Sequence, residues 1–359
     1  MKKKRLRRFL IIDLVLLVAV VATFVVFRNA VKLGKDGDEE MTPETVTETV
    51  DSEQIVLGLK GGDYQKVLAG EKYIEGGAFA IDKEVGALPE ESITIDGDVN
   101  TKKAGKYEVK YTVTSSGITE STIRTVEVVD ESDYGAKATS VPVMMYHWIY
   151  SEDDQPDNID GNWIIDTKME EQLKYLSDNN YYYPSWAELS AWIDGEISLP
   201  EKSIVMTFDD GKLAFFDHGK PLFKKYNVPV TSFMICWDKN YALAKICEDA
   251  NEYTCLENHS YSMHQAGNVE GHRGIIAQMS QDEILADFKA AQERIVNNDA
   301  FAYPYGDYTD AARAAIKEQG FLCAFTTEYG PVTQGMDKTI LPRVRVMGDA
   351  SFETWKDSL

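Results

Sequence analysis

The first strong pattern along the chain is a run of 19 mostly apolar residues from Phe9 to Phe27, which follows six basic residues among the first eight. At a helical rise of about 1.5 Å per residue the run spans roughly 28 Å, close to the ~30 Å hydrocarbon core of a bilayer. Basic residues stay on the cytoplasmic side of a membrane. We therefore expect residues 1–8 to be a cytoplasmic segment, residues 9–27 to be a single-pass membrane anchor, and the rest to be extracellular. A cleaved signal peptide is the alternative, although its apolar region is usually only ~7–15 residues long.

The next two segments differ in how polar and apolar residues alternate. Residues 28–53 are acidic and rich in threonine, which is typical of an extended linker. Within residues 54–130, every second residue is apolar along Tyr107–Val113 and again along Val126–Val128, and Ser116-Gly117 between them predicts a turn. Several such strands within about 75 residues predict a small all-β sandwich.

From residue 136 to residue 359, strands and helices alternate. The predicted strands are the apolar runs VPVMMY, SIVMTF, VPVTSFMI and FLCAFTT. The predicted helices begin with a cap at Asp166 or Thr167, follow SIVMTF as far as Tyr226, begin with a capping box at Ser280 to Glu283, and run from Thr309 to Gly320. Such alternation predicts a parallel sheet, either open or closed into a barrel.

The charge and the cysteines narrow the possible partners and environment. The net charge is −22, and without the six N-terminal bases the chain has 31 basic and 59 acidic residues, a balance of about −28. A surface this acidic argues against a nucleic-acid partner. The cysteines are Cys236, Cys247, Cys255 and Cys323. In an oxidising extracellular space they form disulfides, in one of three pairings, or remain as buried thiols, and their spacing does not match a zinc ribbon.

Two adjacent carboxylates lie at the carboxyl end of the strand SIVMTF, where Asp209 and Asp210 precede Gly211. Neighbouring residues on a strand point to opposite faces, but at a strand end the chain turns, so both carboxylates can reach one cavity. In barrel enzymes, the active-site residues lie at this end of the strands. A metal ligand next to a general base is the functional interpretation, and an ordinary turn is the alternative.

Two of the five histidines, His259 and His264, lie within the segment ENHSYSMH. Residues five apart on an α-helix lie ~140° apart around the axis and cannot share a metal ion. Asn258, Ser260 and Ser262 are poor helix-interior residues, so an irregular segment that turns both rings inward is equally compatible with the sequence. The alternative is a pair of surface or capping histidines.

The motifs TFDDG, HSYSMH and FAYPYG follow one another in the order found in a known family. In this respect the chain from Val141 to Met347 resembles the NodB-like polysaccharide deacetylases, carbohydrate esterase family 4. The resemblance implies a distorted (β/α) TIM-like barrel that removes acetyl groups from N-acetylated sugars. Residues 54–130 resemble bacterial immunoglobulin-like modules, which implies a spacer or an adhesive module.

The resemblance also implies a role for each matching residue. Asp209 corresponds to the general base, and Asp210, His259 and His264 correspond to the ligands of a divalent metal, usually Zn²⁺. The backbone N–H of Tyr305 corresponds to a donor to the oxyanion of the tetrahedral intermediate.

Three features depart from the commonest family pattern. Ala302 stands where an arginine often orients the base, the late stretch LPRVRV has no histidine, and the histidine spacing is longer by one residue. Together they resemble the branch that acts on poly-N-acetylglucosamine exopolysaccharide, in which a histidine of the first strand enters the site. His147 is then the expected general acid, with a histidine that merely closes the strand as the alternative. Arg343 or Arg345 is expected to replace the missing arginine.

These observations predict a membrane-anchored, cell-surface hydrolase that removes N-acetyl groups from an N-acetylglucosamine-containing polymer of the wall or exopolysaccharide. One alternative is an inactive barrel that binds glycans together with the immunoglobulin-like module. Another is a polysaccharide O-acetyl esterase that uses the same residues.

Overall fold

The computed structural model describes residues 53–237 and 245–359 of the chain. The predicted cytoplasmic segment, membrane anchor and all but the last residue of the acidic linker lie outside the described residues. Within the described ranges, no helix combines the length and the apolar character that a membrane crossing needs.

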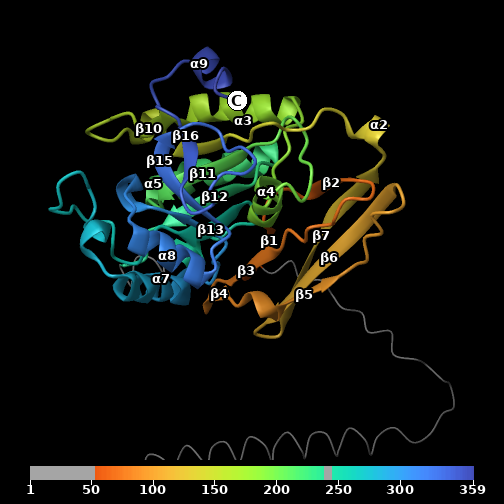
Figure 1. The fold of residues 1–359 in the computed structure, drawn as a ribbon, viewed down its shortest axis with the longest axis horizontal. Helices are drawn as coiled ribbons and strands as arrows, with labels where there is room; N and C mark the ends of the chain where they lie inside the picture. Colours follow the sequence, from red (N-terminus) through yellow and green to blue (C-terminus); the bar gives the residue numbers. More distant parts are fainter. Residues whose placement is uncertain (1–52, 238–244) are drawn as a thin grey trace, which may run out of the picture. The chain divides into compact units, whose positions relative to one another are not determined.

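The first part of the described chain is a sandwich of two β-sheets, as the alternating pattern predicted. One sheet has the strand order β1-β3-β4 and the other has the order β2-β7-β6-β5 (Figure 1). The strands are β1 (Ile55–Leu59), β2 (Tyr64–Leu68), β3 (Ala78–Asp82), β4 (Gly86–Leu88), β5 (Ile93–Asp96), β6 (Gly105–Ser115) and β7 (Ile118–Val129). A short helix, α2 (Glu131–Tyr134), follows β7.

The predicted inward face of the sandwich is confirmed. Val109, Tyr111 and Val113 of β6 are buried in a core that they share with Val126 and Val128 of β7. The β6–β7 hairpin turns at Ser116 and Gly117, both with positive φ (52° and 82°). This matches the two-residue turn that best fits the twist of paired strands.

The second part is a closed barrel of seven strands in the order β11-β12-β13-β14-β15-β16-β8, and every neighbouring pair is parallel. Because β16 pairs with β8, the sheet is closed. Of the two alternatives that the sequence allowed, the barrel is therefore the one found. The strands are β8 (Val143–Tyr146), β11 (Val205–Asp210), β12 (Val230–Met234), β13 (Thr254–Asn258), β14 (Ala300–Ala302), β15 (Cys323–Tyr329) and β16 (Leu341–Arg345). A separate parallel pair, β9 (Trp148–Tyr150) and β10 (Trp163–Ile165), follows β8.

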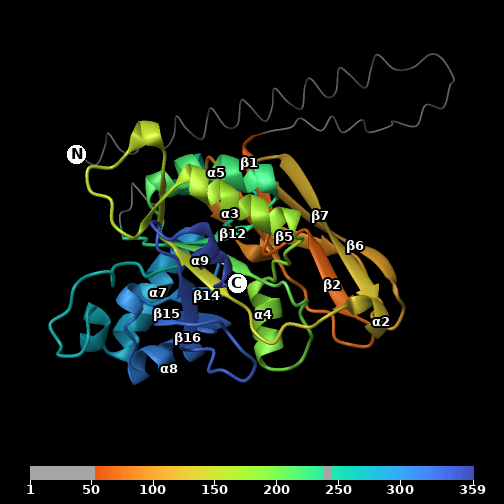
Figure 2. The same cartoon turned by 90° about the horizontal axis from the view of Figure 1, so that it is seen from above.

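Helices surround the barrel, and α7 and α8 lie side by side in both views (Figures 1 and 2). The helices are α3 (Asp166–Asp178), α4 (Trp186–Ile193), α5 (Leu213–Tyr226), α7 (Gln281–Ile295), α8 (Asp310–Gln319) and α9 (Phe352–Lys356). The capping box at Ser280 and the cap at Thr309 are confirmed. The predicted side-chain cap of α3 is wrong, because Asp166 is already the first helical residue and Ile165 holds the cap position without a side-chain hydrogen bond.

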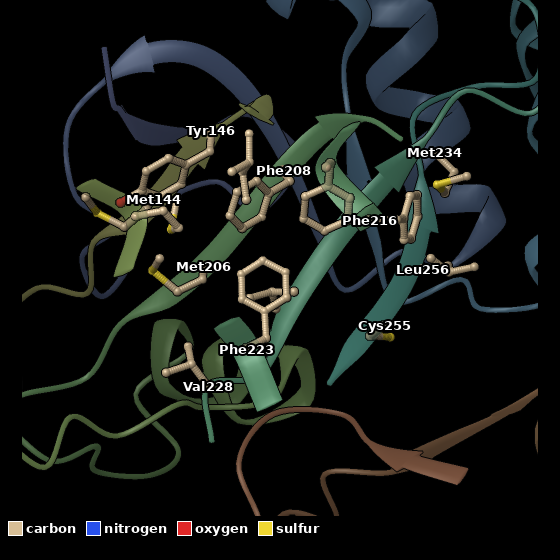
Figure 3. Close-up of a cluster of buried hydrophobic side chains, with 14 of the residues drawn as sticks. Met144, Tyr146, Met206, Phe208, Phe216, Phe223, Val228, Met234, Cys255 and Leu256 are labelled. Carbon is tan, nitrogen blue, oxygen red and sulfur yellow. The ribbon is translucent and has the colours of Figure 1, made fainter. Parts of the chain in front are cut away.

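Strand β11 shows how the barrel aims side chains in two directions. Met206 and Phe208 join Phe223 of α5 in a buried cluster (Figure 3). Since successive side chains of a strand point to opposite faces, Thr207 and Asp209 face the other way. The aromatic cluster thereby fixes the direction in which Asp209 projects.

Candidate active site

Asp209 and Asp210 end strand β11, where the sequence placed them. Strict alternation would send Asp210 to the face of Phe208, away from Asp209. Asp210 instead has a positive φ of 77°, which is uncommon for a residue other than glycine. This turn re-aims the side chain, as predicted for a strand end, and brings it to the loop that follows β13.

Three side chains converge at this end of the barrel. The Nε2 atoms of His259 and His264 lie 3.6 Å and 3.5 Å from the same oxygen of Asp210, Oδ1. One potential ligand atom from each residue lies within 4.8 Å of the others. Zinc–ligand bonds of ~2.0–2.1 Å at a tetrahedral angle place two ligand atoms ~3.3 Å apart, close to these separations. The three residues therefore fit a divalent metal with one coordination position left open.

The surroundings of His259 prepare its ring for this role. Its Nδ1 lies 2.7 Å from the backbone carbonyl oxygen of Ala302. An N–H on Nδ1 that donates to this carbonyl leaves the lone pair on Nε2, the atom that faces Asp210, and this is how proteins orient a metal-binding histidine. Burial lowers the pKa of His259 to about 4, so the ring is neutral near pH 7, as a metal ligand must be.

The segment from His259 to His264 is not helical, so the five-residue spacing does not prevent the two rings from facing the same metal ion. Ser260, between the two histidines, has a positive φ of 76°. Asp287 of α7 accepts hydrogen bonds from the backbone N–H groups of Tyr261 (2.6 Å) and Ser262 (2.8 Å) and from the Ser262 hydroxyl (2.9 Å). A buried carboxylate therefore holds the irregular segment that carries both histidines.

Asp209 forms a bidentate ion pair with Arg343 inside the barrel. Nη1 and Nη2 of the guanidinium each donate to one carboxylate oxygen at 2.7 Å. The Nε of Arg343 donates to the carbonyl of Thr326, and both charged side chains are buried. Burial alone would raise the pKa of Asp209, but the guanidinium outweighs this effect and holds the pKa well below its usual range. Arg345 instead donates to Asn162 (2.8 Å), so of the two arginines considered from the sequence Arg343 contacts the carboxylate.

His147 follows directly after β8, on the same end of the barrel. Burial lowers the pKa of its imidazole, while the nearby charges of Asp209 and Asp210 act in the opposite direction. The ring is thus placed among the carboxylates but is not among the three clustered ligands.

Lys212 lies next to this site and carried no signal in the sequence. Its Nζ is 3.1 Å from the ring centre of Trp148 and 5.8 Å from that of Trp163. Burial lowers the pKa of Lys212, and the charges of Asp210 and Asp160 oppose that shift. One face of Trp148 is therefore covered by a cation.

Tyr305 lies in the turn Pro304–Gly306 with a positive φ of 60°. Its ring packs against that of His264, with the ring centres 4.6 Å apart. A Cβ on Gly306 would lie only 2.2 Å from Oγ1 of Thr327, so the turn approaches β15 as closely as only glycine permits. The turn places the backbone of Tyr305 beside the histidines.

All four cysteines are free thiols in the structure, and Cys236, Cys255 and Cys323 are buried. Of the alternatives left open by the sequence, the structure therefore has the thiols rather than the disulfides.

Two parts of the chain match known protein families. Residues 57–128 match the family described as "Bacterial surface protein, Ig-like domain", and residues 196–324 match "Polysaccharide deacetylase". YxkH of Bacillus subtilis, which is named provisionally as a polysaccharide deacetylase, is 27% identical over 230 residues, 62% of this chain and 78% of that protein. The poly-β-1,6-N-acetyl-D-glucosamine N-deacetylase of Staphylococcus epidermidis is 27% identical over 206 residues, 53% of this chain and 70% of that protein. The Streptococcus pyogenes deacetylase PplD, solved with acetate, has the same fold at a TM-score of 0.51 and 21% identity, covering 62% of this chain and 98% of that one.

Proposed function

We propose that this chain hydrolyses the N-acetyl groups of an N-acetylglucosamine-containing polysaccharide at the cell surface. Supporting this, residues 196–324 match the polysaccharide deacetylase family and residues 57–128 match the bacterial surface Ig-like domain. The observation that carries the proposal is the convergence of Asp210, His259 and His264 within 4.8 Å, beside the buried Asp209–Arg343 pair. A set of metal ligands next to an ionised carboxylate suits hydrolysis of an amide.

We assign the metal site to Asp210, His259 and His264, with Zn²⁺ as the metal. Two imidazoles and one carboxylate with an open position form a donor set typical of catalytic zinc. A metal bound there would supply a Lewis acid for the acetyl carbonyl and would lower the pKa of its bound water.

The other assigned residues transfer protons or stabilise the negative charge that develops during the reaction. Asp209, kept ionised by Arg343, accepts the proton of the attacking water at a carboxylate oxygen. A ring nitrogen of His147 donates a proton to the leaving amine, and the backbone N–H of Tyr305 donates a hydrogen bond to the oxyanion of the tetrahedral intermediate. Because burial lowers the pKa of His147, the ring must receive a proton during the cycle before it can act as the acid.

The substrate that we propose is a polymer of N-acetylglucosamine such as an exopolysaccharide or peptidoglycan. The Staphylococcus epidermidis relative is named for its action on poly-β-1,6-N-acetyl-D-glucosamine. The arginine partner of Asp209 comes from β16 rather than from the third motif, where Ala302 instead supplies its carbonyl to His259. Arg343 therefore takes the place of the arginine that the commoner motif has where this chain has Ala302.

We also propose that residues 9–27 anchor the chain in the cell membrane with the two domains outside. The apolar length of this run and the basic residues before it support the proposal. Recovery of the full-length chain in the membrane fraction, with both domains sensitive to added protease on intact cells, tests it. Release into the medium would contradict it.

The function is tested by measuring acetate release from three substrates: a β-1,6-linked N-acetylglucosamine oligomer, peptidoglycan and an O-acetylated glycan. We expect release from at least one of the N-acetylated polymers and loss of that release after chelation. Release from the O-acetylated glycan alone would identify an esterase. Glycan binding without any acetate release would identify an inactive binding protein.

A further inference from the structure

A cleft of about 570 Å³ lies outside the carboxylate–histidine site. One wall comes from the β-sandwich, within residues 57–66 and at Thr122. The other comes from the barrel domain, within residues 176–183, 226–229 and 252–253 and at Pro200. The volume falls in the range of ~300–1,000 Å³ that is usual for sites that bind small molecules.

The cleft and the candidate active site lie at opposite ends of the barrel. Pro229 directly precedes β12, and Glu252 and Tyr253 directly precede β13, so the cleft lies at the amino ends of these strands. Asp209 and Asp210 lie at the carboxyl end of β11. Strands of this length are ~17–20 Å long, so a ligand in the cleft would not compete for the active site.

Tyrosines dominate the lining of the cleft. They are Tyr64, Tyr181, Tyr182, Tyr183, Tyr226 and Tyr253. All except Tyr182 keep part of their surface accessible. The hydroxyls of Tyr64 and Tyr226 already donate to Glu127 (2.7 Å) and Glu170 (2.9 Å), so the lining offers a ligand chiefly the apolar faces of its rings, which suit the C–H faces of a sugar.

The charged groups of the cleft favour a cation. Asp63 and Glu252 are both exposed at its edge, and Asp63 accepts a hydrogen bond from Asn227 (3.2 Å). The lysine of the lining, Lys66, is engaged elsewhere, because its Nζ donates to the backbone carbonyls of Asp133 (3.0 Å) and Tyr134 (2.7 Å).

Outside the lining, Lys224 lies 3.5 Å from Glu252, but both side chains are exposed. An exposed pair of this kind is easily replaced, because it contributes only ~0–1 kcal/mol. The carboxylates of the cleft are therefore available to an amine of a ligand.

We propose that this cleft is a second saccharide site, which binds amine-bearing, de-N-acetylated segments of the polymer. The inference rests on the proposed function, because removal of an acetyl group converts a neutral amide into a basic amine. A polymer held at both ends of the barrel gains affinity through the high effective concentration of its second segment. The cleft would thus retain processed polymer while acetylated units reach the active site.

The binding test uses the full-length chain and two probes, a glucosamine tetramer and the matching N-acetylglucosamine tetramer, titrated by calorimetry. We expect the glucosamine tetramer to bind more tightly, and we expect Tyr253→Ala to weaken its binding about tenfold. Tyr253→Phe keeps the ring and should retain most of the binding. Asp63→Asn should weaken binding, whereas Asp98→Asn, which removes an exposed carboxylate of the sandwich outside the cleft, should not.

Steady-state kinetics supply a second readout. Tyr253→Ala should raise the KM for a long polymer more than the KM for a tetramer. The proposal is overturned if the cleft variants bind the glucosamine tetramer as the wild type does, if Asp98→Asn acts as strongly as Asp63→Asn, or if the acetylated tetramer binds equally well. A chain that binds the glucosamine tetramer in the cleft but releases no acetate would contradict the proposed function instead.

Discussion

At the residue scale, the buried pair of Asp209 and Arg343 determines the charge available in the site. Breaking a buried ion pair by removing one partner costs ~3–5 kcal/mol, because the other charge remains buried without compensation. We therefore expect Arg343→Met to destabilise the chain by about that amount in urea unfolding. Arg345→Met serves as the matched control, since Arg345 is exposed and donates to the partly buried Asn162, so its loss should change stability by ~0.5 kcal/mol or less.

A double-mutant cycle isolates the pair. Asp209→Asn together with Arg343→Met should cost clearly less than the sum of the two single changes, because neither variant side chain then carries a charge. Additive losses would show that the two residues do not depend on each other.

The same pair predicts how stability depends on pH. In the wild type the pKa of Asp209 is lowered, so its stabilising contribution is present above the unfolded-state pKa of ~3.9 and is lost as the pH falls through the folded-state value. In Arg343→Met, burial raises the pKa of Asp209, and the resulting destabilisation disappears as the carboxylate takes up a proton. The stability gap between the two proteins should therefore narrow between pH 7 and pH 5 in urea unfolding. A gap of constant size would argue against the ion pair as its cause.

Some residues of the site could be predicted from the sequence, and others could not. Asp210, His259 and His264 were expected together from their motifs, and the structure brings them together. The contribution of Ala302 was not visible, because it acts through its backbone carbonyl, which every residue type carries. For the arginine, the sequence left Arg343 and Arg345 open, since residues two apart on a strand share a face and only their depth along the barrel separates them.

At the element scale, helix α7 holds the loop of the two histidines through Asp287. We expect Asp287→Ala to weaken zinc binding ~10–100-fold, as loss of a supporting partner does at other metal sites, because the loop loses three hydrogen bonds. Asp282→Ala, on the exposed side of the same helix, is the matched control.

Competition with a zinc-sensitive dye measures the affinity, and circular dichroism checks that α7 is intact. Equal zinc affinity of the two variants would mean that Asp287 does not position the histidines.

The elements with strong local signals were predicted well. The hairpin turn at Ser116-Gly117, the capping box at Ser280 and the end of α8 at Gly320 all follow from local chemistry. Helix α4 was missed although Ser185 and Glu188 form a capping box, because the helix has only eight residues. Strand β14 was missed as well, since its three residues are too few to show a period.

At the scale of the whole molecule, the sandwich contacts the barrel domain through a buried cation. Lys60, directly after β1, is only 2% exposed, and its Nζ lies 2.7 Å from Oδ2 of Asp299, directly before β14. Lys72 pairs with Glu196 across the same two domains, but both side chains are exposed. These contacts indicate that the sandwich and the barrel form one folded unit. The resemblance in the sequence had implied only a spacer or an adhesive module.

We therefore expect Lys60→Met to destabilise the barrel by ~1–3 kcal/mol, because the partly buried Asp299 loses its charged hydrogen-bond partner, and Lys72→Met to change it by at most ~1 kcal/mol. All six tryptophans lie within residues 136–359, so their fluorescence during thermal unfolding reports on the barrel alone. An unchanged tryptophan transition in Lys60→Met would show that the two domains unfold independently.

We propose that the carboxyl end of the barrel carries out metal-dependent deacetylation, and acetate release measures this reaction. The N-acetylglucosamine polymer that the substrate screen selects is incubated with the zinc-loaded chain, with the chelated chain, with the chelated chain after zinc is restored, and with zinc-loaded Asp209→Asn. We predict release by the loaded chain, loss on chelation, recovery with zinc, and a ~10²–10⁴-fold lower rate for Asp209→Asn. Release that persists after complete removal of the metal, or that is unchanged in Asp209→Asn, would contradict the account.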